Sequence, residues 1–204
     1  MADKLDLKKQ LKHLYQPPAG KVGLVDVPEM NFLMVDGEGD PNTAPAFQEA
    51  TEALFGVSYG IKFTIKIQNL GPDYTVMASE GLWWLRSGHE FDLTKKEEWL
   101  WTLMMMQPDH VTRDIFEQAK SALLHKKGSQ SLIDMRFESF HEGLSAQIMH
   151  IGPYAEEQPT IEKIHRFIEQ EGYRPRDKHH EIYLGDPRRT APERLKTVLR
   201  QPVQ

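Results

Sequence analysis

Glu181 is the side chain in this sequence best placed to bind a cation or to move a proton. It lies in the segment 179–184 (HHEIYL), which reads as a short strand. Because side chains alternate between the faces of a strand, His179, Glu181 and Tyr183 are expected on one face, opposite the core. In an apolar pocket an ionised Glu181 would attract a cationic ligand, and a desolvated one could act as a general acid or base. The alternative is an exposed glutamate paired with a lysine or arginine.

The four tryptophans of the sequence are Trp83, Trp84, Trp99 and Trp101. They fall on two segments that read as neighbouring strands, so the rings at 99 and 101 share one face and the adjacent rings at 83 and 84 point to opposite faces. One face therefore carries up to three indoles, and Met104 and Met106 continue the opposite face. Indoles offer stacking area and thioethers adapt in shape, so the pattern suits flat, apolar and variable ligands. The alternative is that these are ordinary core residues.

Other kinds of chemistry have less support in the sequence. His179 and Glu181 lack a third ligand at suitable spacing, so no metal site is predicted. The segment 37–39 (GEG) lacks the Lys-Ser/Thr of a phosphate loop and reads as a tight turn. No Gly-x-Ser-x-Gly element supports a serine nucleophile. We therefore expect no cofactor.

The elements that must position these side chains occur in the same order twice, as strand, helix, strand, strand. In the first half we expect a strand at 30–36, a helix opened by Asn42 or Thr43, strands at 74–86 and 98–107 joined by a charged loop at 87–97, and a helix capped by Asp109. In the second half we expect a strand at 136–151, a helix stopped by Gly172, a strand at 179–184, a capping-box turn at 190–193 and a last strand to Pro202. A short helix at 6–15 precedes both. The order predicts an α+β fold, by duplication or by coincidence.

Composition limits the classes of function. The 204 residues suit one domain, and a net charge of −5 without a basic run argues against a nucleic-acid partner. There is no cysteine, no run of about 20 apolar residues and no signal-peptide core at the N-terminus. We expect a cytoplasmic protein that does not enter a membrane, and the sequence leaves its oligomeric state open.

Several motifs together resemble the GyrI-like small-molecule-binding family. They are 26–30 (DVPEM), 36–41 (DGEGDP), 80–84 (EGLWW), 98–108 (EWLWTLMMMQP), 181–190 (EIYLGDPRRT) and 199–203 (LRQPV). The resemblance covers nearly the whole chain. It implies a single domain over 1–204, with antiparallel sheets, helices on one face and a ligand groove between two modules related by a pseudo-twofold axis. Module one would span about 22–128 and module two about 129–204.

The resemblance also implies a function. The family is similar to the multidrug-binding domains of MerR-type activators, in which a buried glutamate contacts cationic aromatic drugs, and the matching residue is Glu181. Residues before 30 are too few for a helix-turn-helix, so we do not expect a transcription activator. Stand-alone members with the paired-tryptophan motif are similar to hydrolases of cyclopropane-bearing DNA-alkylating toxins.

That reading favours a cofactor-free enzyme whose ligand is an aromatic small molecule. Glu181 would act on the attacking water, and Tyr154 or Tyr183 would donate to the developing oxyanion. The expected ligand-binding residues are Trp84, Trp101, Trp99, Tyr59, Met104, Met106 and His150. The alternative is a non-catalytic multidrug-binding, sequestering or gyrase-inhibitor-like module.

Overall fold

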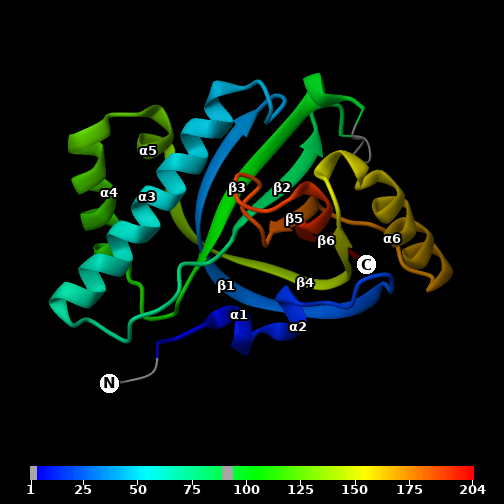
Figure 1. Cartoon of the computed structure of the whole chain (residues 1–204), viewed down its shortest axis with the longest axis horizontal. Helices are drawn as coiled ribbons and strands as arrows, with labels where there is room; N and C mark the ends of the chain where they lie inside the picture. Colours follow the sequence, from blue (N-terminus) through cyan, green and yellow to red (C-terminus); the bar gives the residue numbers. More distant parts are fainter. Residues whose placement is uncertain (1–3, 89–93) are drawn as a thin grey trace.

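The computed structural model of the chain describes residues 4–88 and 94–204, and a closed antiparallel barrel lies at its centre (Figure 1). In this described part the barrel has six strands, in the spatial order β1–β3–β2–β5–β6–β4. The strands are β1 (Gly23–Glu38), β2 (Ser79–Leu85), β3 (Trp99–Gln107), β4 (Arg136–Ile151), β5 (His179–Tyr183) and β6 (Lys196–Pro202). The predicted α+β class is confirmed, and the sheets of the two halves close on each other.

Two modules with the same strand order build the barrel. In each module the third strand pairs with both of the others, β3 with β1 and β2, and β6 with β4 and β5. The modules meet where β1 pairs with β4 and β2 pairs with β5, so that two strands of each module lie beside their counterparts. This pairing fits the predicted pseudo-twofold relation, and the duplication with its module bounds stays a prediction.

Helices cover the outside of the barrel. They are α1 (Leu7–Gln10), α2 (Lys12–Tyr15), α3 (Pro45–Gln68), α4 (Arg113–Lys127), α5 (Gln130–Asp134) and α6 (Gln158–Gln170), with single turns η1 (Lys96–Glu98), η2 (Tyr154–Glu156) and η3 (Pro192–Arg194). Figure 1 shows α3, α4 and α5 on one side of the barrel and α6 on the other. Ile161, Ile164 and Ile168 lie at the spacing of one helix face and are buried between α6 and the sheet. No helix within the described residues has the length and apolar character to cross a membrane.

The predicted N-caps of α3 are wrong. Neither Asn42 nor Thr43 caps the helix, which begins after Ala44 without a side-chain cap. The amide of Asn42 instead donates to Asp40 Oδ1 at 2.7 Å, so this side chain belongs to the preceding turn. A proline at the first helical position, where no N–H is needed, lets the helix start without a capping oxygen.

The predicted N-cap of α4 is also wrong. Thr112 rather than Asp109 caps the helix, and its hydroxyl oxygen accepts from Ile115 N at 3.4 Å. The chain first makes a turn in which Val111 N donates to Pro108 O at 3.0 Å. Because of this turn, the N-cap is Thr112 instead of Asp109. At the other end, the helix stops at its C-cap residue Gly128.

Two strand predictions need correction. The strand predicted at 30–36 extends over the whole of β1, because its first half pairs with β4 as well. The strand predicted at 74–86 is shorter, since β2 begins at Ser79. Of the predicted charged loop at 87–97, residues 89–93 lie outside the described part of the chain.

Two local predictions near the chain ends also change. The helix predicted at 6–15 is two short helices, α1 and α2, because Leu11 leaves the helical region with φ −101° and ψ 41°. The turn predicted at 190–193 forms as η3, but Ala191 precedes it and no side chain caps it. The capping-box pattern therefore marks the turn without making the capping bonds.

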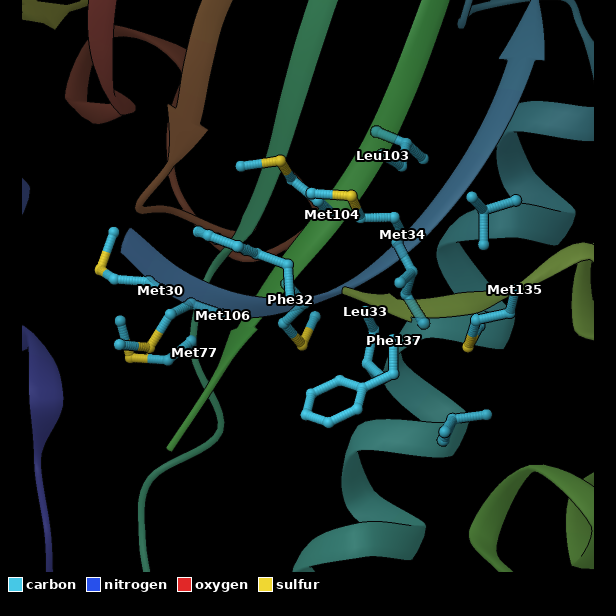
Figure 2. Close-up of a cluster of buried hydrophobic side chains, with 14 of the residues drawn as sticks. Met30, Phe32, Leu33, Met34, Met77, Leu103, Met104, Met106, Met135 and Phe137 are labelled. Carbon is cyan, nitrogen blue, oxygen red and sulfur yellow. The ribbon is translucent and has the colours of Figure 1, made fainter. Parts of the chain in front are cut away.

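Methionine side chains fill much of the barrel interior. Met34 lies opposite Met104 and Phe32 lies opposite Met106 across the β1–β3 ladder, and all four side chains are buried. Figure 2 shows them on one side of these strands, with Leu33 on the other side, toward α3. Flexible thioethers fill irregular space well, which explains their use where strands of two modules converge.

An ionic network crosses the barrel interior from strand to strand. His180 Nδ1 lies 3.0 Å from Glu142 Oε1, and His180 Nε2 lies 3.0 Å from Glu80 Oε2. Arg200 Nη1 donates to Glu142 Oε2 at 2.9 Å, and Tyr15 OH donates to Glu80 Oε1 at 2.9 Å. All five side chains are buried. Because both imidazole nitrogens face carboxylates, His180 is an imidazolium, and two cations balance two anions.

The same network fixes the N-terminal segment to the end of the barrel. Arg200 Nη2 donates to the carbonyl oxygen of Leu14 at 2.8 Å, and Gln147 Nε2 donates to the carbonyl oxygen of His13 at 2.6 Å. The side chain of Leu14 is fully buried beside them. The last carbonyls of α2 are thus bonded by β4 and β6, as buried helix ends require.

This network makes stability depend on pH in a defined direction. Burial lowers the pKa of His180, but Glu142 and Glu80 outweigh this and raise it to about 9. Burial raises the pKa of Glu142, but His180 and Arg200 outweigh this and lower it to about 2. The His180 contribution is complete below its unfolded pKa of 6.5 and is lost as the pH rises through about 9. The Glu142 contribution is present above 4.5 and is lost as the pH falls toward 2.

We therefore expect the contribution of this network to the free energy of unfolding to be largest between about pH 4.5 and 6.5. It should fall by roughly 3 kcal/mol between about pH 6.5 and 9, as 1.4 kcal/mol per pKa unit gives. Urea unfolding at a series of pH values measures this. The variant His180→Gln should lack this loss of roughly 3 kcal/mol above pH 6.5, and an equally steep decline in that variant would show that another group causes it.

Candidate functional site

A chain of two hydrogen bonds holds the Glu181 carboxylate. The indole Nε1 of Trp83 donates to Tyr183 OH at 2.9 Å, and Tyr183 OH donates to Glu181 Oε2 at 2.8 Å. Glu181 is only 6% exposed. Burial and the Glu181 charge raise the pKa of Tyr183 well above its usual range, so its hydroxyl remains a donor. Tyr183 and Glu181 can form this hydrogen bond because they lie on the same face of the strand, as predicted.

Gly81 gives this group its space. In the β2–β5 ladder, Gly81 lies directly opposite Glu181. A Cβ at Gly81 would lie 3.0 Å from Tyr183 OH and only 2.6 Å from Trp83 Nε1, and the second distance is closer than real Cβ atoms approach. A residue without a side chain at this position therefore allows the indole and the phenol to meet over β2.

Three indoles share the same face of β2 and β3. Trp83 lies opposite Trp101 in the ladder, and its ring centroid is 5.4 Å from that of Trp99. Phe47 of α3 packs on this group, 5.9 Å from Trp83 in a stacked arrangement and 5.2 Å from Trp101 edge to face. The three indoles are buried, and Phe47 is partly exposed. The predicted alternation of faces, with three indoles on one, matches this arrangement.

Gly37 is the second glycine that the indole cluster needs. A Cβ at this position would lie 2.1 Å from the ring of Trp101, which passes directly over the backbone of β1. The segment 37–39 ends the strand, and Gly39 has φ 92°, a left-handed conformation that favours glycine. The glycines of this segment thus serve a close aromatic contact and a turn.

Module two brings a second phenol to the site. The rings of Tyr154 and Tyr183 meet edge to face with centroids 5.6 Å apart. Burial, followed by the charges of Glu157 and Glu181, raises the pKa of Tyr154 to about 12. Within residues 4–88 and 94–204, no group forms a hydrogen bond with the Tyr154 hydroxyl. That hydroxyl therefore remains a protonated donor.

His150 supports the turn that carries Tyr154. Its Nδ1 lies 3.0 Å from Thr160 Oγ1 and its Nε2 lies 3.3 Å from the carbonyl oxygen of Pro153. Both ring nitrogens are therefore engaged with η2 and α6. The structure places His150 behind Tyr154, where it can orient the turn.

Glu157 is a site residue that the sequence analysis missed. It is 1% exposed, immediately precedes α6, and interacts electrostatically with Glu181. A sequence signal existed, because position 157 continues the buried stripe of α6 at 161, 164 and 168 backward by four residues. A carboxyl group on an apolar helix stripe is a candidate functional group.

The side chains of Trp84, Met104 and Met106 lie away from Glu181. The side chain of Trp84 points to the opposite face of β2 from Trp83, and Lys178 Nζ lies 3.4 Å from its ring centroid. Met104 and Met106 point into the barrel interior, on the face of β3 opposite the indoles of that strand (Figure 2). The structure therefore does not bring these three side chains to Glu181.

The remaining predicted residues have different surroundings. Tyr59 is 47% exposed on α3 and stacks on Phe63 with ring centroids 6.3 Å apart, away from the indoles. His179 Nε2 lies 3.5 Å from Glu181 Oε1. No group of three potential metal ligands occurs in the described residues. The side chains that the structure gathers are Glu181, Tyr183, Tyr154, Trp83, Trp99, Trp101, Phe47 and Glu157.

A two-module barrel that holds a buried carboxylate among indole and phenol rings has the features of a small-molecule-binding domain. Residues 21–204 match the GyrI-like small molecule binding domain, and the chain belongs to this family. A comparison with curated proteins found no match.

Solved structures agree with this assignment. An uncharacterized conserved protein from Listeria innocua is 41% identical, with a TM-score of 0.90, over 98% of this chain and all of that one. A hydrolase encoded by lin2189 from Listeria innocua is 40% identical, with a TM-score of 0.88, over 99% of this chain and 100% of that chain. The EcmrR C-terminal domain shares the fold, with a TM-score of 0.54 at 11% identity over 90% of this chain and 97% of that chain.

Proposed function

We propose that this protein binds planar aromatic, lipophilic or cationic small molecules at the Glu181 cluster and hydrolyses cyclopropane-bearing DNA-alkylating toxins. The observation that carries the proposal is the hydrogen-bonded series from Trp83 through Tyr183 to Glu181, beside a Tyr154 hydroxyl that has no partner in the described part of the chain. The similarity to a hydrolase from Listeria innocua over nearly the whole chain supports an enzymatic role.

Stacking would hold the ligand. Phe47 occupies the stacked position over Trp83, on a helix of module one, and a planar ligand would take that position. The carboxylate of Glu181 would attract a cationic group on the ligand, since a cation also interacts favourably with indole faces. The affinity would then come from apolar area and one charge contact, which suits a varied set of ligands.

The proposed reaction adds one water molecule to the substrate. The water oxygen attacks a CH₂ carbon of the cyclopropane, the strained C–C bond breaks, and its electron pair moves into the conjugated dienone, whose oxygen becomes a phenolate. Glu181 accepts one proton from the water, and this proton then passes to the phenolate, which gives the phenol and restores the Glu181 carboxylate. The products of this step are an alcohol and a phenol in one molecule that no longer alkylates DNA.

Tyr154, rather than Tyr183, would donate to the dienone oxygen. The hydrogen of Tyr183 OH is already donated to Glu181, so this residue holds the carboxylate. The hydrogen of Tyr154 OH is uncommitted within the described residues, and a donor aimed at developing negative charge is worth roughly 10²–10³-fold in rate. We expect Tyr154→Phe to lower kcat by about that factor, with little change in ligand affinity.

Steady-state kinetics and dye binding on the same variant check this assignment. Tyr59→Phe is the matched control, because it removes a hydroxyl from the exposed face of α3. If Tyr154→Phe keeps the wild-type kcat while Tyr183→Phe loses it, the roles of the two tyrosines are reversed.

The proposal as a whole is tested by incubating the protein with a cyclopropane-bearing aromatic alkylator and analysing the mixture by mass spectrometry. Hydrolysis yields a product heavier by one water, formed in many turnovers per protein molecule. The alternative is a binding or sequestering module, which the family's description as a small molecule binding domain favours. In that case the alkylator is recovered intact, although it binds.

A further inference from the structure

Glu157 is a buried carboxyl group without an internal cation. Its side chain is 1% exposed, and its Oε1 atom has no hydrogen-bond partner in the described part of the chain. Its neighbours with charge or a titratable proton are Glu181 and Tyr183 from β5 and Tyr154 from η2. No lysine or arginine among residues 4–88 and 94–204 forms an ion pair with either glutamate. Two carboxyl groups therefore share one apolar site.

Two neighbouring carboxyl groups in an apolar site cannot both ionise at low cost. Burial raises the pKa of Glu157 well above its usual range, and the negative charge of Glu181 raises it further. The hydroxyl of Thr197 lies beside Glu157 and opposes the shift, but Thr197 Oγ1 makes no hydrogen bond of acceptable geometry. On the other side, His179 Nε2 lies 3.5 Å from Glu181 Oε1. Tyr183 also donates to Glu181 and so favours the ionised form of that residue.

We propose that Glu157 and Glu181 form one carboxyl pair that holds a single proton, which resides on Glu157. The two carboxyl groups then carry one negative charge between them, which suits ligands that carry a single positive charge or none. This inference rests on the proposed ligand site at Glu181 and deepens it by giving the charge class of the ligand. Glu157 acts through Glu181, as a positioning residue that keeps Glu181 the ionised member of the pair.

Infrared spectroscopy of the ligand-free protein tests the shared proton directly. A protonated carboxyl group has a C=O stretching band well separated from the bands of carboxylates. We expect this band at neutral pH in the wild type and in the control variant Glu156→Gln, whose side chain is exposed on the adjacent position. The band should be absent in Glu157→Gln, in which an amide of the same shape replaces the acid. Its absence from the wild type, or its persistence in Glu157→Gln, overturns the proposal.

Binding of a planar monocationic dye, rhodamine 6G, gives the functional test. In the wild type and in Glu156→Gln, loss of the shared proton at alkaline pH adds a second negative charge, and dye affinity should rise by about tenfold or more. In Glu157→Gln the affinity at neutral pH should stay within about threefold of wild type and the alkaline rise should vanish. A rise of wild-type size in Glu157→Gln, or a large loss of affinity at neutral pH, contradicts the proposal.

The two measurements separate this inference from the proposed function. The infrared band is recorded without ligand, so it reports on the carboxyl pair even if the protein hydrolyses nothing. If the band behaves as expected but no alkylator is consumed, the hydrolase proposal fails and the carboxyl pair stands. If alkylator is consumed but the band is missing, the hydrolase proposal stands and the carboxyl pair fails.

Discussion

Replacing Glu181 with glutamine is expected to lower the turnover of a cyclopropane-bearing aromatic substrate by about 10²–10⁴-fold, the usual contribution of a general base. The amide cannot accept the proton of the attacking water, although it can still accept the hydrogen bond from Tyr183 OH. The indoles remain in place, so neutral aromatic ligands should bind with nearly wild-type affinity. Product formation and equilibrium binding, measured on the same preparation, separate the two effects.

A charge-matched control makes that result interpretable. Glu29→Gln removes one carboxylate from an exposed position on β1 and should leave both turnover and binding unchanged. If Glu181→Gln hydrolyses the substrate at the wild-type rate, Glu181 is not the base. If it loses binding of neutral aromatic ligands as well as turnover, the carboxylate acts mainly in holding the fold of the site.

The local features of the fold were predictable from the sequence because side-chain directions repeat every few residues along a strand or a helix. The alternation along β2 and β3 predicts which indoles share a face, and the period of α6 predicts its buried isoleucines. The pairing of β1 with β4 was not predictable from these patterns. It joins residues more than 100 positions apart, and nothing in either strand alone specifies its partner.

The site was predictable only in part for the same reason. Glu181 and Tyr183 meet because they are two residues apart on one strand. Trp84 was expected in the pocket, but its ring faces Lys178. The sequence could not decide between Trp83 and Trp84, because that choice requires knowing which face of β2 the helices cover. The burial of Glu157 next to an exposed Glu156 depends on the angle at which α6 meets the barrel. Tertiary geometry decides these cases.

The ionic network in the barrel interior gives the second large expected effect. Glu142→Gln should lower the free energy of unfolding by about 3–5 kcal/mol, the usual cost of removing one partner from a buried ion pair. The amide preserves the shape, so no cavity forms. However, Arg200 and His180 then remain as two buried cations with Glu80 as their only nearby anion in the network. Since whole domains are stable by about 5–15 kcal/mol, the change is readily measured by urea unfolding.

Glu138→Gln on the same strand is the matched control for this prediction. Glu138 pairs with Arg136 at 3.0 Å, but its side chain is 51% exposed, and such surface pairs contribute about 0–1 kcal/mol. The two variants remove the same charge four residues apart, so the difference between them isolates the effect of burial. A loss below about 1 kcal/mol in Glu142→Gln would mean that water or a shifted proton replaces the missing carboxylate. The network would then position α2 and the strands without contributing much to stability.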